Sequence, residues 1–519
     1  MAQESRAQKS LLNARVSVFY LCLSVVISFF SRKIFLDTLG TNFLGLTSTL
    51  NGLLGFLSLA ELGIGTAIGV SLYKPLADKN HEEINEVMSV MAYFYRYVGI
   101  VVLGAGIVLS LFLPIIFERE KDVSLLVIYL AYYAFFCSSL FTYFFNYKQT
   151  LLSADQRNYE VTKYSQAANI AKYILQMTCA YYWESPYIWI ALELLFGILF
   201  CIILNRRIRK VYPWLDCSPL RGKLLHKKFP EIGTYTKQLF LQRIGVLVLN
   251  NVSPILMYSF SSLTAIALYS NYTMVSGKLS LFVEAFLGST SASVGNLIAE
   301  GDKNKIHRVF RQILCIRFFI AGFFIFLLYN LTDPFIALWL GEEYVLDRII
   351  LYIILASTFI TYCRGAIDQF LYGYKLFKDV WSIYALAVLF LIFAIIGGRI
   401  WGLAGVAGGS VLAHIIITCI WKPYFLFSQG FKVSVWKYWC LYFTHAVIIA
   451  VSALLTFGIV RLFPEIELNS YVNWIKYACL LGVSYLCINI VLLYLFAPEM
   501  KDVIVQFKFM LSKRKDEKK

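Results

Sequence analysis

Long apolar stretches separated by short polar turns constrain the fold of this chain more than any other feature of its sequence. There are fourteen such stretches, and each is long enough, at about 20 residues or more, to cross a hydrocarbon core as an α-helix. The mean hydropathy is +0.68 and only 15% of the residues are charged, as is typical of a membrane protein. We therefore predict an all-α integral membrane protein with transmembrane helices at residues 11–31, 44–72, 86–117, 123–151, 162–183, 187–205, 236–260, 263–298, 309–331, 345–373, 380–397, 401–421, 438–462 and 473–497.

The polar segments between these spans are too short to fold as soluble domains. The longest runs from Arg206 to Tyr235, and at about 30 residues it is below the usual minimum for a domain. A hydrolase, nucleotide-binding or glycosyltransferase domain in a loop is therefore excluded. The 11 cysteines are scattered and show no spacing typical of metal ligands, so we expect neither a metal site nor a cofactor.

Basic residues are distributed unequally between the two sides of the predicted bundle. The formal net charge is +16, and the even-numbered loops carry about 30 lysines and arginines against about 7 in the odd-numbered loops. This asymmetry predicts a multi-pass protein of the bacterial cytoplasmic (inner) membrane with both termini in the cytoplasm. It also explains the positive charge without a nucleic-acid partner. The basic segment 206–235 is either a solvated linker or lies on the inner leaflet.

Two pairs of similar segments indicate an internal repeat. Residues 151–161 align with 370–380, and residues 77–84 resemble 301–306. We therefore predict an N-terminal lobe of six spans (1–205), a basic cytoplasmic linker (206–235) and a C-terminal lobe of six spans (236–422). An extra helix pair (438–497) and a basic tail (498–519) follow. Such repeats are common in transporters, with the substrate site between the two halves.

The segment from Thr41 to Ile84 resembles the opening of polysaccharide-biosynthesis flippases. Its most specific part is the run Glu61-Leu62-Gly63-Ile64-Gly65-Thr66, which is followed by a basic turn. The flippases are the Wzx-type O-antigen and exopolysaccharide translocases of the multidrug/oligosaccharidyl-lipid/polysaccharide (MOP) superfamily. The two halves, the short basic loops and the extra terminal helix pair are also similar to the fold of that superfamily.

The resemblance implies a transporter that flips undecaprenyl-diphosphate-linked oligosaccharide from the inner to the outer leaflet by alternating access. The product would serve the assembly of surface polysaccharide, such as the O-antigen of lipopolysaccharide, capsule or exopolysaccharide. The implied partners are the lipid-linked substrate, the bilayer, a proton or sodium ion, and a polysaccharide polymerase with its chain-length machinery.

Three alternatives stay open. The first is a flippase for lipid II or another lipid-linked glycan, and the second is a cation-coupled drug exporter of the same superfamily. The third is a membrane-embedded polysaccharide polymerase, but the sequence has neither a substantial external loop nor a histidine-centred catalytic group. A drug exporter would favour an anionic or aromatic cavity for cationic drugs, whereas the charged residues inside these spans are mainly basic. We therefore expect a transporter and not an enzyme.

Basic residues inside the spans are candidates for binding a diphosphate headgroup, because buried charge is costly and is usually retained for function. We predict that Arg15, Arg243 and Lys278 line a cationic cleft between the lobes, since they lie on spans that form the cleft in the fold this chain resembles. Asn250 shares a face with Arg243, and Asn271 shares one with Lys278. Further basic residues inside the spans are Arg96, Lys148, Lys172, Arg317 and Arg364. Of these, Arg96 and Arg317 occupy corresponding places in the two halves, which suggests a repeated structural role.

Carboxyl groups inside the spans are candidates for coupling transport to an ion. Glu61 extends a polar stripe along its span and has no basic residue one helical turn away, so it either exchanges protons or makes a hydrogen bond between helices. Glu284 and Glu193 are weaker cases of the same kind. Asp368 lies four residues after Arg364, on the same helical face, and the two can pair. The glycine-rich run 402–410 lies inside an apolar span and indicates close helix packing.

Overall fold

A computed structural model describes residues 6–505 except 58–63, 289–290, 375, 377–378 and 465. All regular secondary structure in this part of the chain is helical, which confirms the predicted all-α fold. Among the described residues, nine helices are long and apolar enough to cross a membrane. The chain divides into two compact units, Met1–Ala267 and Leu268–Lys519. The lobe boundaries predicted from the internal repeat, at residues 205 and 236, stay a prediction.

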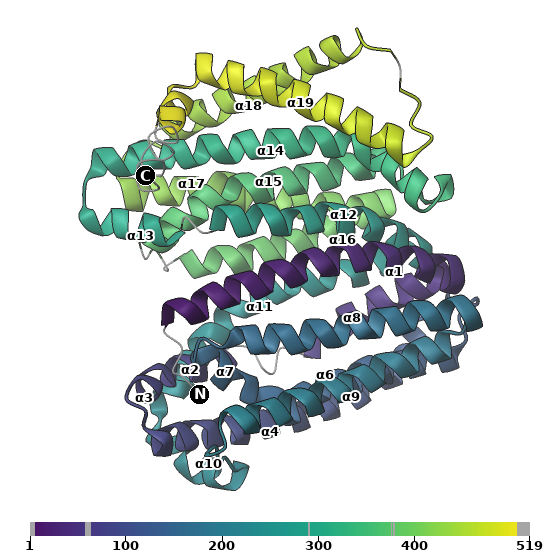
Figure 1. Cartoon of the computed structure of the whole chain (residues 1–519), viewed down its shortest axis with the longest axis vertical. Helices are drawn as coiled ribbons and strands as arrows, with labels where there is room; N and C mark the ends of the chain where they lie inside the picture. Colours follow the sequence, from purple (N-terminus) through teal and green to yellow (C-terminus); the bar gives the residue numbers. More distant parts are fainter. Residues whose placement is uncertain are drawn as a thin grey trace, which may run out of the picture. The chain divides into compact units, whose positions relative to one another are not determined.

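The helices of the first unit are joined by short turns (Figure 1). They are α1 (Arg6–Leu57), α2 (Ile64–Ser71), α3 (Tyr73–Ala77), α4 (His81–Leu111), α5 (Leu113–Ile116), α6 (Leu125–Phe144), α7 (Gln149–Ala154), α8 (Asn158–Trp183), α9 (Pro186–Val211), α10 (Pro219–Leu225) and α11 (Pro230–Phe260). The next helix, α12 (Leu263–Gly288), begins in the first unit and continues in the second.

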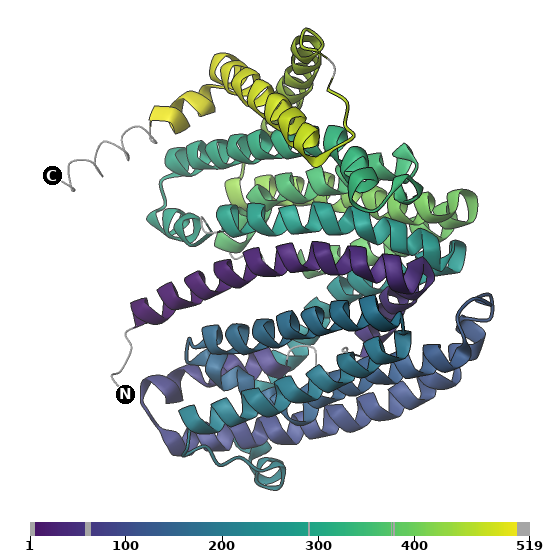
Figure 2. The ribbon, with the colours of Figure 1, turned by 45° about the vertical axis from the view of Figure 1, so that its right-hand side comes forward.

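The second unit continues with α13 (Ser291–Glu300), α14 (Lys303–Trp339), α15 (Arg348–Gly373), α16 (Val380–His414), α17 (Lys422–Phe425), α18 (Trp436–Val460) and α19 (Tyr471–Phe496). Two π-helical segments, Ile415–Trp421 and Leu426–Phe431, flank α17 and keep the chain helical from α16 onward. Helices α18 and α19 pack on one another and on α14, as Figures 1 and 2 show.

Where the structure describes them, the predicted spans correspond to helix, but two pairs of spans are joined without a loop. Gly40 interrupts α1 with a φ of 76°, and Gly402 interrupts α16 with a φ of 56°. Both values lie in the left-handed region that glycine adopts without steric cost. The chain therefore changes direction at these two glycines. Helix α1 contains the first predicted span and the beginning of the second, and α16 contains the span 380–397 and most of the span 401–421.

Several predicted span boundaries are wrong. The first helix continues beyond residue 31 to Gly40, and the helical segment predicted to end at residue 421 continues to Phe431. The span predicted at 123–151 instead ends at Phe144 and is followed by the separate helix α7, and the span predicted at 263–298 includes residues 289–290, which lie outside the described residues. Hydropathy marks the part of a helix that suits hydrocarbon, whereas the helix itself extends as far as its backbone hydrogen bonds continue.

Glycines permit close approach between helices in both units. In the first unit, a Cβ atom added at Gly52 would lie 3.1 Å from the carbonyl oxygen of Asn251 in α11, and one at Gly55 would overlap the Asn251 side chain. In the second unit, a Cβ at Gly405 would overlap the backbone of Gly397. The close helix packing predicted for the run 402–410 is therefore confirmed, and the glycines of α1 allow it in the same way.

The similar turns predicted from the sequence repeat have similar structures. Asn80 caps α4 by accepting a hydrogen bond from the backbone of Glu83, and Asp302 caps α14 by accepting one from Lys305. Each turn also contains a residue with positive φ, at 53° for Lys79 and 80° for Gly301. Because the cap shifts by two positions between Asn80 and Asp302, the two turns are similar without being identical.

The basic segment after α9 is docked against the first unit. Gly222 of α10 approaches the backbone of Ser89 in α4 so closely that any Cβ would overlap it. Lys228 pairs with Glu86 of α4 at 2.5 Å. Leu220 and Leu224 of α10 remain exposed. The segment is thus not a free linker in solvent, and its exposed leucines suit the alternative that it lies on the membrane surface.

Candidate functional site

Several charged side chains lie close together among the helices of the second unit. We call Glu284 of α12, Arg317 of α14, Arg364 and Asp368 of α15, and Lys422 of α17 the charge cluster. It contains three cations and two carboxylates, so it keeps a positive excess. Charges at this position in a membrane helix are costly unless they are paired or serve a ligand.

Arg317 is the buried centre of the charge cluster. Its side chain is only 1% exposed, and its Nη1 lies 3.6 Å from Oε1 of Glu284. The same nitrogen donates a hydrogen bond of 2.9 Å to the backbone carbonyl of Tyr362. Its guanidinium occupies the space where Gly365 of α15 has no side chain. These contacts hold α12, α14 and α15 together, as expected for a structural arginine.

Asp368 joins two cations that lie on different helices. Its Oδ1 accepts a hydrogen bond of 2.8 Å from Nζ of Lys422, and its Oδ2 lies 3.8 Å from Nε of Arg364. The predicted pairing of Arg364 with Asp368 is therefore confirmed, but it is too long for a hydrogen bond. Because Asp368 bonds to Lys422, the charge of Arg364 is only weakly compensated. Arg364 is also the more exposed cation, at 39% against 20% for Lys422.

Two carboxyl groups predicted to lack a cation are paired in the structure. Glu284 faces Arg317, as described above, and Glu193 of α9 lies 2.7 Å from Nζ of Lys172 in α8. Gln176 also donates a hydrogen bond of 3.2 Å to Glu193. The prediction was wrong because it considered only residues one turn apart on the same helix, whereas both partners come from a neighbouring helix.

The remaining predicted residues lie in several environments. Arg15 is exposed on α1. Lys278 is half-buried on α12, and Asn271 of the same helix is fully buried with no hydrogen-bond partner for its amide among the described residues. The side chains of Arg243 and Asn250, and the whole of Glu61, lie outside the described residues. Their predicted roles, and the cationic cleft between the lobes, stay predictions.

Sequence reasoning missed Lys422 and His414 as members of this region. Lys422 was assigned to a cytoplasmic loop, but the helix continues past it and places its amine on Asp368. His414 lies near Arg364 and Lys422, and its Nδ1 is bonded to the carbonyl of Ser410 at 2.9 Å. No sequence signal marked this continuation, because Pro423 favours a helix break, whereas the structure tolerates it in the first turn of α17.

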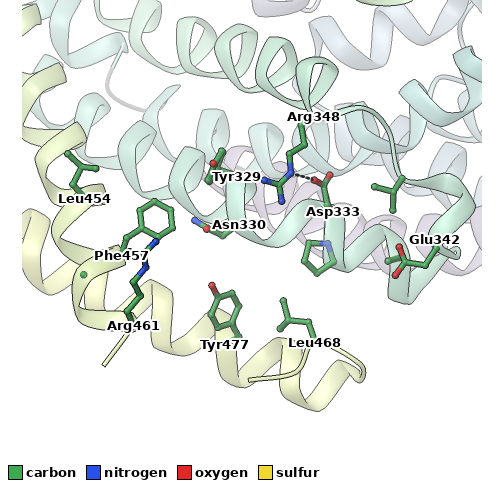
Figure 3. A pocket seen from close by; sticks show the side chains of 14 residues that line it. Tyr329, Asn330, Asp333, Glu342, Arg348, Leu454, Phe457, Arg461, Leu468 and Tyr477 are labelled. Atoms are coloured by element: carbon green, nitrogen blue, oxygen red, sulfur yellow. Dashed lines mark ion pairs between the residues drawn. The ribbon is translucent and has the colours of Figure 1, made fainter. Parts of the chain in front are cut away.

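A second polar site lies at the far end of α14 (Figure 3). This outer cavity has a volume of about 890 Å³ and lies between α14, α18 and α19. Asp333 of α14 faces Arg348 at 3.7 Å. Tyr272 donates a hydrogen bond of 2.7 Å to the same carboxylate. Glu342 and Arg461 also line the cavity. The charges of its two acidic and two basic residues cancel, so this cavity does not favour an anionic ligand.

Comparison with solved structures identifies the fold. The chain is similar to the lipid II flippase MurJ in an inward closed conformation, with a TM-score of 0.65 and 15% identity over 93% of this chain and 99% of that chain. It is also similar to an inward-facing multidrug resistance MATE family transporter of the MOP superfamily. That match has a TM-score of 0.57 and 11% identity, over 78% of this chain and 95% of the transporter.

A third similar structure is the Vibrio cholerae MATE transporter VcmN in its bent form, with a TM-score of 0.51 and 13% identity over 82% of this chain and 98% of that chain. No protein-family model matches the sequence, and no curated protein does. At these identities the likeness establishes the fold alone, which this chain shares with these multi-pass membrane transporters.

Proposed function

We propose that this protein flips undecaprenyl-diphosphate-linked oligosaccharide from the inner to the outer leaflet for the assembly of surface polysaccharide. The observation that carries the proposal is the fold match over 93% of this chain to a flippase of a lipid-linked substrate. The MATE match covers only 78% of the chain and thus leaves more of it unexplained. The positive excess of the charge cluster supports an anionic substrate over the cationic drugs of an exporter.

The proposed mechanism divides the substrate between two environments. The hydrophilic headgroup passes through a wet, cationic path, while the polyprenyl tail stays in lipid. Arg364 suits the diphosphate, because its planar fork can donate two parallel hydrogen bonds and its contact with Asp368 is long. Arg15, Arg243 and Lys278 remain proposed contacts along the same path. Glu61 and Asp368 remain proposed coupling groups for a proton or sodium ion.

Deletion of the gene is expected to cause undecaprenyl-linked oligosaccharide to accumulate on the inner leaflet. Extraction of lipid-linked sugars from the deletion strain, with the intact gene returned as control, measures this directly. Accumulation of lipid II instead would favour the alternative flippase activity. Unchanged lipid-linked pools together with greater drug sensitivity would favour a drug exporter. Accumulation of single oligosaccharide units on the outer leaflet would indicate a polymerase.

Both termini and α10 are expected to face the cytoplasm. The reason is the excess of lysine and arginine on that side of the predicted bundle. In a cysteine-free variant, a cysteine placed at Arg221 should react with a thiol reagent only after the membrane is permeabilised. A cysteine introduced at Arg461, in the turn after α18, is the control and should react in intact cells. The reverse pattern would contradict the topology.

A further inference from the structure

An inner cavity of about 860 Å³ lies in the second unit, at the opposite end of α14, α18 and α19 from the outer cavity. Its rim carries four basic residues, and one carboxylate, Glu499, also lines it. Glu499 already faces one of the cations, Arg311, at 3.7 Å. The cavity therefore keeps a positive excess, unlike the balanced outer cavity. The basic rim residues are Lys303, Arg311, Lys432 and Lys437.

The interior of the inner cavity is apolar and aromatic. Phe310, Phe427, Phe431 and Tyr438 line it and belong to the buried core of the second unit. Phe310 contacts both Phe427 and Phe431 edge to face, with ring centroids 5.6 and 5.2 Å apart. A ligand that fits such a cavity must combine an anionic group at the rim with hydrocarbon inside.

The rim cations are concentrated where three helices meet. Arg311 and Lys437 both lie near His307, whose ring contacts that of Phe431 in a tilted arrangement at a centroid distance of 4.6 Å. Lys303 is the first residue of α14, at the end of the helix that Asp302 caps. By the distribution of basic residues this end of α14 faces the cytoplasm, where the leaflet carries anionic lipids.

We propose that the inner cavity binds an anionic membrane phospholipid, with its phosphate at the basic rim and its acyl chain against the aromatic interior. The lipid would connect the extra helix pair α18–α19 to α14 at the cytoplasmic surface. Basic pockets between transmembrane helices on the cytoplasmic side are typical sites for such headgroups. This site differs from the charge cluster and does not depend on the proposed transport function.

The test titrates the purified full-length protein with short-chain phosphatidylglycerol and measures the rise in its apparent unfolding temperature. The variant Lys432→Gln/Lys437→Gln removes two exposed rim charges. The matched control, Arg348→Gln/Arg461→Gln, removes two charges from the outer cavity at the other end of the same helices. Each lost rim charge should weaken binding about fivefold, so the rim variant should bind on the order of 20-fold more weakly. The control should bind normally.

Three further measurements complete the test. Phosphatidylcholine and inorganic phosphate should stabilise the protein far less than phosphatidylglycerol, and 0.5 M salt should weaken the phosphatidylglycerol effect on the unmodified protein. Equal effects of the two phospholipids, or equal losses in both double variants, would overturn the proposal. Equal stabilisation by inorganic phosphate would show that the aromatic interior is not used and would overturn it too. Tighter binding of undecaprenyl diphosphate that the rim variant abolishes would reassign the cavity to a transport substrate.

Discussion

Replacing Arg364 with glutamine is expected to reduce glycan export at least tenfold while the amount of protein in the membrane stays unchanged. Arg364 is the most exposed cation of the charge cluster, and its 3.8 Å contact with Asp368 leaves its fork available to a diphosphate. A hydrogen bond to a charged group contributes about 1.5–3 kcal/mol, and 1.4 kcal/mol corresponds to tenfold. Surface polysaccharide in a complemented deletion strain, with immunoblotting for abundance, measures the effect.

The control for this substitution is Arg348→Gln. Arg348 has a contact of similar length with a carboxylate, 3.7 Å to Asp333, but it lines the outer cavity and is 71% exposed. The Arg348→Gln variant is expected to export glycan normally. Arg364→Lys keeps the charge without the planar fork and should retain part of the activity. Normal export by Arg364→Gln would remove this residue from the proposed substrate path.

The neighbouring Lys422 allows a sharper test of the same interpretation. Lys422→Gln removes the cation that Asp368 bonds at 2.8 Å, so Asp368 would then compensate Arg364 and reduce export. Adding Asp368→Asn removes that compensation, so restored export would show that Asp368 acts only on Arg364 and is not a coupling group. If the double variant stays inactive while Arg364 is still required, Asp368 has a role of its own, which would support it as a coupling group.

The sequence predicted the membrane fold well because the property that determines it is local. A helix in lipid must satisfy its own backbone and present apolar side chains, so each span can be recognised from about 20 consecutive residues. Glycines that allow close helix packing, such as Gly405, could also be predicted from the local sequence. The local sequence did not show that the chain turns at Gly40 and Gly402, because glycine is also common inside membrane helices.

Ion pairs between helices could not be predicted in the same way. Asp368 and Arg364 are one turn apart, and their pairing followed from helix geometry. Asp368 and Lys422 are 54 positions apart, and Glu284 and Arg317 come from two different helices. Which helices become neighbours depends on packing across the whole unit. For that reason the partner of Glu284 and the position of Lys422 within a helix could not be predicted from the sequence.

The largest effect on stability is expected from the contact between Arg317 and Gly365. Arg317→Ala should lower the free energy of unfolding by about 3 kcal/mol, because it leaves a void beside the Tyr362 carbonyl and removes the partner of Glu284. SDS titration of the purified protein measures this change. Arg96, predicted to have a corresponding role in the first half, is exposed on α4. Arg96→Ala is therefore the control and should change stability by less than about 0.5 kcal/mol.

The variant Gly365→Val tests whether the Arg317 guanidinium occupies the space next to Gly365. Even a Cβ atom there would overlap the Arg317 guanidinium, so valine must displace it and should be strongly destabilising. In the Arg317→Ala background that space is vacant, and the same valine should fill part of the void. The double variant is then expected to be about 1–2 kcal/mol more stable than the sum of the single effects. Additive losses would show that Arg317 does not lie over Gly365, and the structural role assigned to this arginine would have to rest on its hydrogen bond to Tyr362 alone.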